Sequence, residues 1–149
     1  LLFTLFFGLL VDVTATADAA TAPEEPIADR DAVHAAVLDY VEGLYENDPS
    51  RIERSVHPEL TKRGWKRDRR GVYREHPLTF ERLVDGAERF DTTGWIPDDA
   101  PKEIVIFDVL DRVASAKLTA VWGIDYLHLA KFDGRWQILH VIWQGHPSD

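Results

Sequence analysis

A two-residue turn signal joins two strand-like segments in the last third of the chain. Residues 125–143 read Asp-Tyr-Leu-His-Leu-Ala-Lys-Phe-Asp-Gly-Arg-Trp-Gln-Ile-Leu-His-Val-Ile-Trp. The Asp133-Gly134 pair favours a type I′ turn, because both central residues of that turn need positive φ and glycine adopts it freely. The sequence therefore predicts an antiparallel hairpin, and the fold must cover at least one of its faces.

The predicted hairpin register sorts the side chains into two faces. With Phe132 opposite Arg135, Leu127 lies opposite His140, and residues at alternate positions share a face. One face is mostly apolar but carries a carboxylate and an imidazole: Asp125, Leu127, Leu129, Trp136, Ile138, His140 and Ile142. The opposite face carries Tyr126, His128, Leu139, Val141 and Trp143.

The segment before the hairpin supports the same assignment of faces. Residues 113–122 alternate, and one face has the small and apolar set Ala114, Ala116, Leu118, Ala120 and Trp122. A tight turn at Gly123-Ile124 would pair Trp122 with Asp125, which places this set on the face of Asp125 and His140. With a further alternating segment at 103–110, these strands predict an antiparallel meander.

Helical patterns precede the meander. The first helix is expected from Asp29 or Asp31 to about Glu46, with one apolar stripe: Val33, Val37, Tyr40, Val41 and Leu44. A short second helix is expected from Asp48-Pro49 to His57-Pro58, and a third over residues 79–90. Two weak strands are expected around Gly64-Trp65 and Val72-Tyr73. Helices followed by a meander with one apolar face are typical of an α+β fold.

Composition limits the class of function. The 149 residues suffice for one domain with its own core, and the net charge of −9 disfavours nucleic-acid binding. The absence of cysteine excludes disulfides and thiolate metal sites. No metal-ligand spacing, phosphate-binding glycine loop or nucleophile elbow is present, so we expect no metal and no cofactor.

The N-terminal segment is typical of an export signal. Residues 1–11 are apolar over the length of a signal-peptide core, too short to cross a bilayer, and small residues near Ala19 offer a cleavage site. We expect a signal peptide and cleavage region at 1–22, a linker at 23–28 and the domain at 29–149. The protein would then be periplasmic or secreted. The alternatives are a membrane-tethering stub, or no export and a cytoplasmic protein.

Three segments resemble a known family. They are Gly-Leu-Tyr-Glu-Asn-Asp-Pro-Ser-Arg-Ile-Glu-Arg-Ser-Val-His-Pro-Glu-Leu-Thr-Lys-Arg at 43–63, Asp-Tyr-Leu-His-Leu-Ala-Lys at 125–131 and Gly-Arg-Trp-Gln-Ile at 134–138. Together they resemble the putative lumazine-binding family of the SnoaL-like superfamily, over about residues 29–144. The resemblance implies a cone-shaped nuclear transport factor two-like fold, with three helices packed on a curved antiparallel sheet. It also implies a deep pocket at one end and, commonly, a homodimer through the outer sheet face. The superfamily includes cyclases, isomerases, dehydratases and non-enzymatic binders, so the fold does not give the chemistry.

Six residues are candidates for contact with a ligand: Tyr40, His57, Trp65, Trp122, Asp125 and His140. Asp125 and His140 are also candidate catalytic residues, because a carboxylate can orient an imidazole that acts as general base. The alternative is a buried structural hydrogen bond between them. His57 fits either a helix C-terminal cap or the mouth of a pocket, and the aromatic residues fit either the core or ligand stacking.

Two surface features add expectations about partners. A basic run at 62–70 is either a solvated loop or a positive rim that draws anionic ligands: Lys62, Arg63, Lys66, Arg67, Arg69 and Arg70. The outward face of the hairpin is expected to form a homodimer interface through Tyr126, His128, Leu139, Val141 and Trp143.

Three functions remain open at this point. The first is an exported, dimeric domain that binds a small apolar or aromatic molecule without turning it over, with neither nucleic acid nor stable membrane insertion. The second is an isomerase, cyclase or dehydratase that uses Asp125 and His140 for proton transfer. The third is an interaction module with a filled cone. The enzyme requires the two side chains to lie within hydrogen-bond reach and to face an open cavity.

Overall fold

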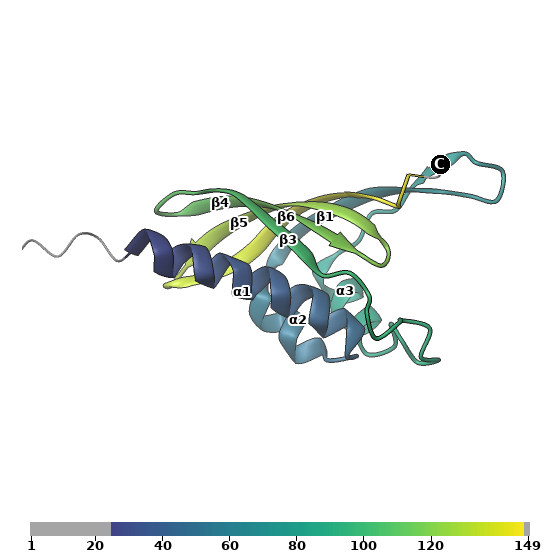
Figure 1. Cartoon of the computed structure of the whole chain (residues 1–149), viewed down its shortest axis with the longest axis horizontal. Coiled ribbons are helices and arrows are strands. Elements are labelled where there is room, and N and C mark those ends of the chain that lie inside the picture. The colour runs from purple at the N-terminus through teal and green to yellow at the C-terminus, as the bar shows by residue number, and fades with distance from the viewer. Residues whose placement is uncertain (1–24, 148–149) are drawn as a thin grey trace, which may run out of the picture.

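Three helices lie on one face of a curved sheet in the computed structural model, which describes residues 25–147 (Figure 1). The helices are α1 (Glu25–Tyr45), α2 (Pro49–Ser55) and α3 (Phe80–Ala87). The strands are β1 (Val56–Arg67), β2 (Tyr73–Glu75), β3 (Glu103–Val109), β4 (Val113–Ala120), β5 (Gly123–Phe132) and β6 (Arg135–Gln144). This is the α+β, nuclear transport factor two-like architecture that the sequence predicts. The predicted signal peptide at 1–22 and the start of the linker lie outside the described residues.

Helix α1 supplies the apolar stripe that packs on the sheet. All five predicted stripe residues are buried: Val33, Val37, Tyr40, Val41 and Leu44. The helix begins at Glu25, so residues 25–28 are helical rather than part of a linker. Asp29 is not a cap. It accepts hydrogen bonds from Lys131 Nζ at 2.9 Å and Trp136 Nε1 at 3.0 Å, which attach the start of α1 to the β5–β6 hairpin.

Helices α2 and α3 begin at the residues that the sequence indicates. Asp48 caps α2 by accepting from the backbone N–H of Ser50 at 3.0 Å, and Thr79 caps α3. Helix α2 ends at Ser55, two residues before the predicted end, because the chain turns extended at Val56 and continues as β1. His57 is therefore a strand residue and not a helix cap.

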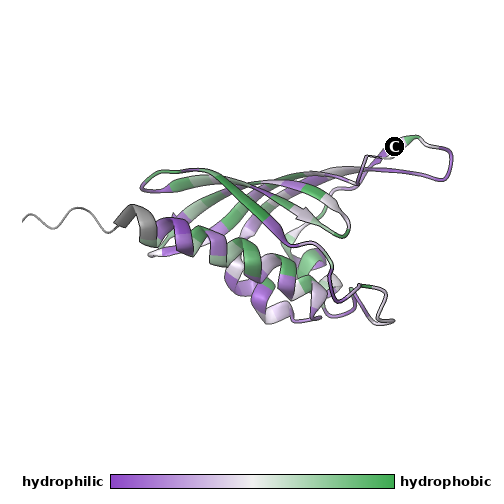
Figure 2. Cartoon of the chain, in the orientation of Figure 1, coloured by the Kyte–Doolittle hydropathy of each residue, from purple (hydrophilic) through white to green (hydrophobic). Residues whose placement is uncertain are grey.

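The sheet is mixed, with strand order β2-β1-β6-β5-β4-β3. Strand β1 runs parallel to β6, and all the other neighbours are antiparallel. The prediction of a purely antiparallel sheet is wrong at this one pairing, because α2 and β1 return the chain to the edge of the meander in the direction of β6. Hydrophobic and hydrophilic residues alternate along the strands, and the loop between β1 and β2 is mainly hydrophilic (Figure 2). The β1–β2 hairpin and the C-terminus lie at one end of the molecule, and α1 begins at the other (Figure 1).

The β4–β5 pairing differs from the predicted register by an even number of residues. Ala120 pairs with Gly123 and Leu118 with Asp125, so the turn lies at 121–122 and not at 123–124. Because side chains alternate with a period of two, this shift keeps Asp125 on the face of Leu118. The predicted inward direction of Asp125 is confirmed, although the turn that predicted it is misplaced.

The β5–β6 pairing contains a bulge that reverses the predicted faces of the last residues. The turn forms as predicted, with φ of 48° at Asp133 and 78° at Gly134, and Leu129 pairs with Ile138. The next pair is His128 with His140, which leaves Leu139 as the extra residue. A single extra residue turns every later side chain of β6 to the other face. Beyond Leu139, the predicted faces of β6 are therefore wrong.

Candidate functional site

A cavity of about 700 Å³ opens between the sheet and α3, at the end of the molecule that holds the β1–β2 hairpin and the C-terminus. Ligand pockets in proteins have volumes of about 300–1,000 Å³. The lining is mostly aromatic, aliphatic and basic: Tyr40, Leu44, Lys62, Lys66, Arg67, Tyr73, His76, Leu78, Arg82, Leu83, Gly86, Phe90, Trp95, Val121, Trp122, Trp143, Gly145 and His146.

A buried network around Asp125 forms the floor of this cavity. Tyr40 Oη donates to Asp125 Oδ2 at 2.8 Å, and Lys62 Nζ donates to the same oxygen at 3.0 Å. Trp122 Nε1 donates to Oδ1 at 2.9 Å, and Lys62 Nζ also donates to Tyr40 Oη at 2.6 Å. Asp125 is fully buried and Lys62 is 6% exposed. Both carboxylate oxygens are thus satisfied, as burial of a charge requires.

Burial has the largest effect on the pKa values of Lys62 and Tyr40. It lowers the pKa of Lys62 below its ordinary value, while the adjacent Asp125 carboxylate acts in the opposite direction. The pKa of Tyr40 is raised well above its ordinary value by burial first, and then by the negative charge of Asp125. Tyr40 therefore remains a protonated donor. Lys62 and Asp125 form a buried salt bridge, with 3.0 Å between Nζ and Oδ2.

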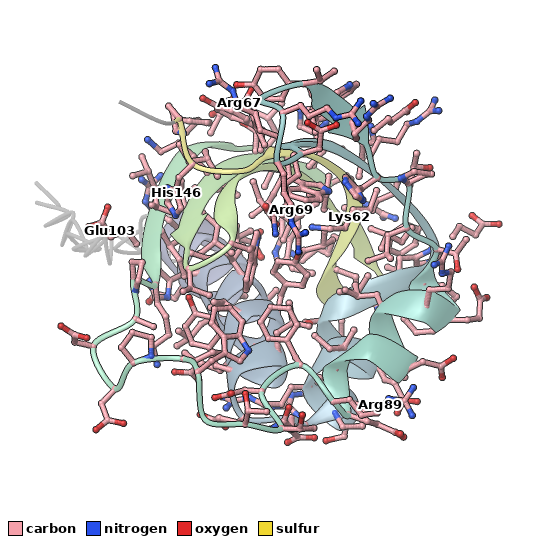
Figure 3. All side chains as sticks on the ribbon, turned by 90° about the vertical axis from the view of Figure 1, so that its right-hand side faces the viewer. Lys62, Arg67, Arg69, Arg89, Glu103 and His146 are labelled. Atoms are coloured by element: carbon pink, nitrogen blue, oxygen red, sulfur yellow. The ribbon has the colours of Figure 1, made fainter. Side chains whose placement is uncertain are left out.

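Lys62 extends from the floor to the cavity wall. Its ammonium nitrogen lies 5.3 Å from the ring centre of Tyr40 and 5.5 Å from that of Trp143. These distances are typical of cation–π contacts. Figure 3 shows Lys62 between the strands and the helices, whereas Arg67, the last residue of β1, lies farther from the helices. An ammonium group has three N–H donors, and the network uses two of them. Within residues 25–147, no further hydrogen bond of Lys62 Nζ is found.

Trp143 forms a flat aromatic wall because Gly64 has no side chain. A Cβ atom at Gly64 would lie 2.1 Å from Trp143 Nε1, so only glycine at this position of β1 admits the indole. Gly64 and Trp143 are register partners across the parallel β1–β6 pair. The indole nitrogen is buried and, within the described part of the chain, has no hydrogen-bond partner. The ring of His76 lies 6.1 Å from that of Trp143.

The structure brings together three of the six predicted ligand contacts. Tyr40 and Trp122 line the cavity, and Asp125 lies directly behind them. Trp122 is also held by edge contacts with the rings of Tyr40, Tyr45 and Phe90 at 5.6–6.0 Å. The indole is therefore fixed between the carboxylate and a group of aromatic side chains.

The other three predicted contacts do not line this cavity. His57 stacks on Phe132 at 4.1 Å, and its Nδ1 accepts from the backbone N–H of Glu59 at 3.1 Å. Trp65 follows Gly64 on β1, so its side chain lies on the opposite face and is 38% exposed. His140 lies on the outer face because of the bulge at Leu139. The prediction that Asp125 and His140 share one face of the sheet is therefore wrong.

His140 has a different partner on the outer face. His128 and His140 are register partners, with 3.2 Å between their Nδ1 atoms and 5.4 Å between their ring centres. Tyr126 and Ile142, also register partners, are 54% and 44% exposed. Leu139, Tyr126 and His128 thus lie on the outer face as predicted, but Ile142 was expected on the inner one.

Two residues predicted for the outer face are inside. Val141 is fully buried in the core, and Trp143 lines the cavity. By register, the odd-numbered positions of β6 change from the outer face to the inner face at the bulge. The assignment of Val141 and Trp143 to a dimer interface is therefore wrong.

Lys62, like Trp143, is a residue of the site that the sequence interpretation placed elsewhere. It was grouped with the basic run at 62–70, although it alternates with two other buried residues of β1, Leu60 and Gly64. The period of two in residues 60–64 would have placed it inside the sheet if β1 had been predicted from its start.

The described residues also bear on a metal site and on a membrane-spanning helix. Residues 25–147 contain no group of three or more His, Asp or Glu side chains arranged to hold a metal ion. Within that range, no helix has both the length and the apolar character needed to cross a membrane.

A sequence profile of the putative lumazine-binding family matches residues 28–144, which is most of the chain. No protein of curated function matches the chain in sequence. The profile match covers all the strands and nearly all of α1.

Solved structures share the fold at low sequence identity. A nuclear transport factor two-like protein of unknown function from Shewanella baltica OS155 is 19% identical, with a TM-score of 0.60 over 82% of this chain and 97% of that one. A second such protein, from Silicibacter pomeroyi DSS-3, is 16% identical, with a TM-score of 0.64 over 81% and 98%. A putative scytalone dehydratase from Novosphingobium aromaticivorans is 14% identical, with a TM-score of 0.57 over 82% and 87%. At these identities the similarity concerns the fold alone.

Proposed function

Because the chain belongs to the putative lumazine-binding family, we propose that it binds a small, largely aromatic molecule in the cavity beside α3 and releases it unchanged. The observation that carries this proposal is the open cavity of about 700 Å³, whose walls include Trp95, Trp122, Trp143 and Phe90. An interaction module with a filled cone would not need this volume. Aromatic walls with a few placed polar groups are typical of small-molecule sites.

The geometry favours binding over proton transfer. Asp125 is fully buried and already accepts three hydrogen bonds, so it has no position from which to reach a substrate. His140 lies on the other face of the sheet and cannot assist it. The isomerase, cyclase or dehydratase alternative depended on these two groups facing one cavity, and this structure gives it no support.

Binding can be tested with a matched pair of variants at Gly86. This residue lines the cavity from α3, and a Cβ atom there would have no neighbour within 4 Å. Gly86→Trp should occupy the cavity without disturbing the fold, and Gly86→Ala should leave it open. The purified domain would be incubated with a cell extract, and native mass spectrometry would identify any molecule that co-purifies.

A ligand that is carried by the wild type and by Gly86→Ala, but not by Gly86→Trp, is the expected result. A ligand carried equally by Gly86→Trp would show that the cavity is not the binding site. Absence of any ligand from the wild type across several extracts would contradict the proposed function.

We also propose that two copies associate through the outer face of the sheet. Its exposed side chains include four large hydrophobic residues, Val105 and Phe107 on β3, Tyr126 on β5 and Ile142 on β6. Exposed apolar side chains that gather on one face of a sheet can mark an interface. Light scattering on the purified domain, which gives the molar mass in solution, tests this proposal.

Export remains a separate proposal that rests on residues 1–22 alone. Expression of the full chain with its native N-terminus, followed by cell fractionation and N-terminal sequencing, tests it. A mature N-terminus near Ala19 in the exported fraction is the expected result, and an intact N-terminus in the cytoplasm would contradict it.

A further inference from the structure

We infer that the ligand of the cavity is an organic anion, with a flat apolar part inside the cavity and its negative group at the mouth between Lys66 and Arg82. The inference rests on the proposed function and names the class of molecule bound. It follows from the distribution of charge around the cavity and from the shape of the aromatic walls.

The cavity lining has the opposite charge to the chain as a whole. The sequence contains 26 acidic and 17 basic residues, with a net charge of −9. Among residues 25–147, the lining nevertheless contains four Lys or Arg residues, two histidines and no Asp or Glu. A concentration of positive charge at the mouth of a low-dielectric cavity attracts anions and repels cations.

Not all four cations are equally available. The charge of Lys62 is offset by Asp125 at the floor, and the guanidinium of Arg67 lies 4.9 Å from the ring centre of Tyr73. Within residues 25–147, neither Lys66 nor Arg82 has a carboxylate within ion-pair distance. By contrast, six cations elsewhere in the described residues are held by acidic neighbours: Arg51, Arg54, Arg63, Arg74, Lys102 and Lys131.

Lys66 and Arg82 come from opposite walls. Lys66 is near the end of β1 on the sheet side, and Arg82 is in the first turns of α3 on the helix side. Both side chains are long and exposed and line the same cavity, which places a positive charge on each side of an anionic group held at the mouth. Arginine adds a planar donor pair that matches a carboxylate, and lysine adds a compact positive charge.

The aromatic walls indicate that the anion is organic and flat. Trp122, Trp143 and Phe90 present rings to a cavity of about 700 Å³. An inorganic ion such as phosphate would leave these surfaces in contact with water. A fused aromatic ring system would instead bury them, which is the main source of affinity for a site of this kind.

A matched pair of probes separates charge from shape. Pyrene-1-carboxylate and pyrene-1-carboxamide have the same ring system and nearly the same size, but only the first is anionic at neutral pH. Titration of the full chain by pyrene fluorescence would give both dissociation constants. We expect the carboxylate to bind at least about tenfold more tightly, as for a hydrogen bond to a charged group, and we expect high salt to reduce the difference.

Variants identify the source of the preference. Lys66→Gln combined with Arg82→Gln should remove the preference for the carboxylate by weakening its binding at least about tenfold, with a much smaller change for the carboxamide. Arg135→Gln is the matched control, because Arg135 is exposed, begins β6 after the hairpin turn and is not part of the lining. It should retain the full preference, and thermal unfolding would verify that all variants are folded.

The outcomes distinguish this inference from the proposed function. Equal affinity of the wild type for the two probes, or a preference that survives in the double variant, would overturn the inference and leave the binding function standing. Failure of both probes to bind would overturn the binding function, and the inference with it.

Discussion

The two faces of the β5–β6 hairpin differ in the burial and the hydrogen bonding of their titratable side chains. On the inner face, Asp125 is fully buried and accepts hydrogen bonds of 2.8–3.0 Å from Lys62, Tyr40 and Trp122. On the outer face, His140 contacts the ring of His128, and its neighbour Ile142 is exposed. The same two strands thus hold a fixed polar network on one side and an open surface on the other.

The difference depends on one extra residue, Leu139. Without this bulge, His140 would face Asp125, and Trp143 would lie outside. With it, Trp143 packs over Gly64 as a wall of the cavity, and His140 is removed from the site. A bulge is therefore able to decide which residues of a strand belong to a binding site.

The largest expected effect of a substitution is on the inner face. Lys62→Met removes the cation that offsets Asp125 and leaves a buried carboxylate without its ion pair. Breaking a buried pair in this way costs about 3–5 kcal/mol of the free energy of unfolding. Urea denaturation measures this loss. Arg69→Met, in the exposed part of the same basic run, is the control and should change stability by less than about 0.5 kcal/mol. Comparable stability of the two variants would contradict the network.

A substitution on the outer face should change the association of two copies and not the folding of each. Ile142→Lys places a charge on the proposed interface, where a substitution at a central residue costs about 2 kcal/mol or more of association free energy. The variant should be monomeric by light scattering at concentrations where the wild type is a dimer, with unchanged thermal stability of the monomer. A wild type that is monomeric throughout would contradict the interface.

Gly64→Ala tests whether Trp143 is inside. The added Cβ would lie 2.1 Å from Trp143 Nε1, so the indole must move, at a cost of about 1–3 kcal/mol. Gly86→Ala, which adds the same methyl group in open space, should be neutral or slightly stabilising. Chemical denaturation and tryptophan fluorescence measure both. An unchanged fluorescence spectrum in Gly64→Ala would place Trp143 elsewhere.

A surface ion network provides a contrast with the buried pair. The hydrogen bond from Arg54, and then that from Arg51, holds the pKa of Asp39 below its ordinary value of 3.8. A lowered carboxyl pKa in the folded state stabilises the protein at pH values above 3.8, and this contribution is lost as the pH falls through the folded value. Asp39→Asn should cost about 1 kcal/mol or less at neutral pH and nothing in strong acid. Unfolding measured against pH checks this, and a constant cost would contradict it.

His140→Gln should have the smallest effect. Because His140 lies outside the cavity, its replacement should leave ligand affinity unchanged and alter stability by less than about 0.5 kcal/mol. Calorimetric titration of the variant measures the affinity. A large loss of binding would return His140 to the inner face and contradict the bulge.

The fold was accessible from sequence, whereas part of the site was not. Asp133-Gly134 gave the hairpin, and alternation in residues 113–120 gave the inward face of Asp125 even though the intervening turn was misplaced. That error was harmless because the register moved by an even number of residues. The bulge at Leu139 moved the register by an odd number of residues, and no glycine or proline in the sequence indicates the bulge. In the sequence, the bulge is indicated only by the numbering of the inward apolar residues. They are even-numbered before it, at Trp136 and Ile138, and odd-numbered after it, at Val141 and Trp143.

The burial of Lys62 was not predicted for a related reason. A lysine in a basic run is usually solvated, and only its place between Leu60 and Gly64 on β1 indicates burial. The partner that permits burial, Asp125, is 63 residues away in sequence, so local patterns could not pair the two.

The five tryptophan indoles allow the most direct test of the central claim, that the ligand site lies on the inner face beneath α3. Each indole N–H gives its own signal in a nitrogen–proton correlation spectrum, and single Trp→Phe variants assign them. Titration with pyrene-1-carboxylate should shift the signals of the three cavity residues, Trp95, Trp122 and Trp143. The signals of Trp65, on the outer face, and Trp136, bonded to Asp29, should not move. Shifts confined to Trp65 or Trp136 would contradict the account.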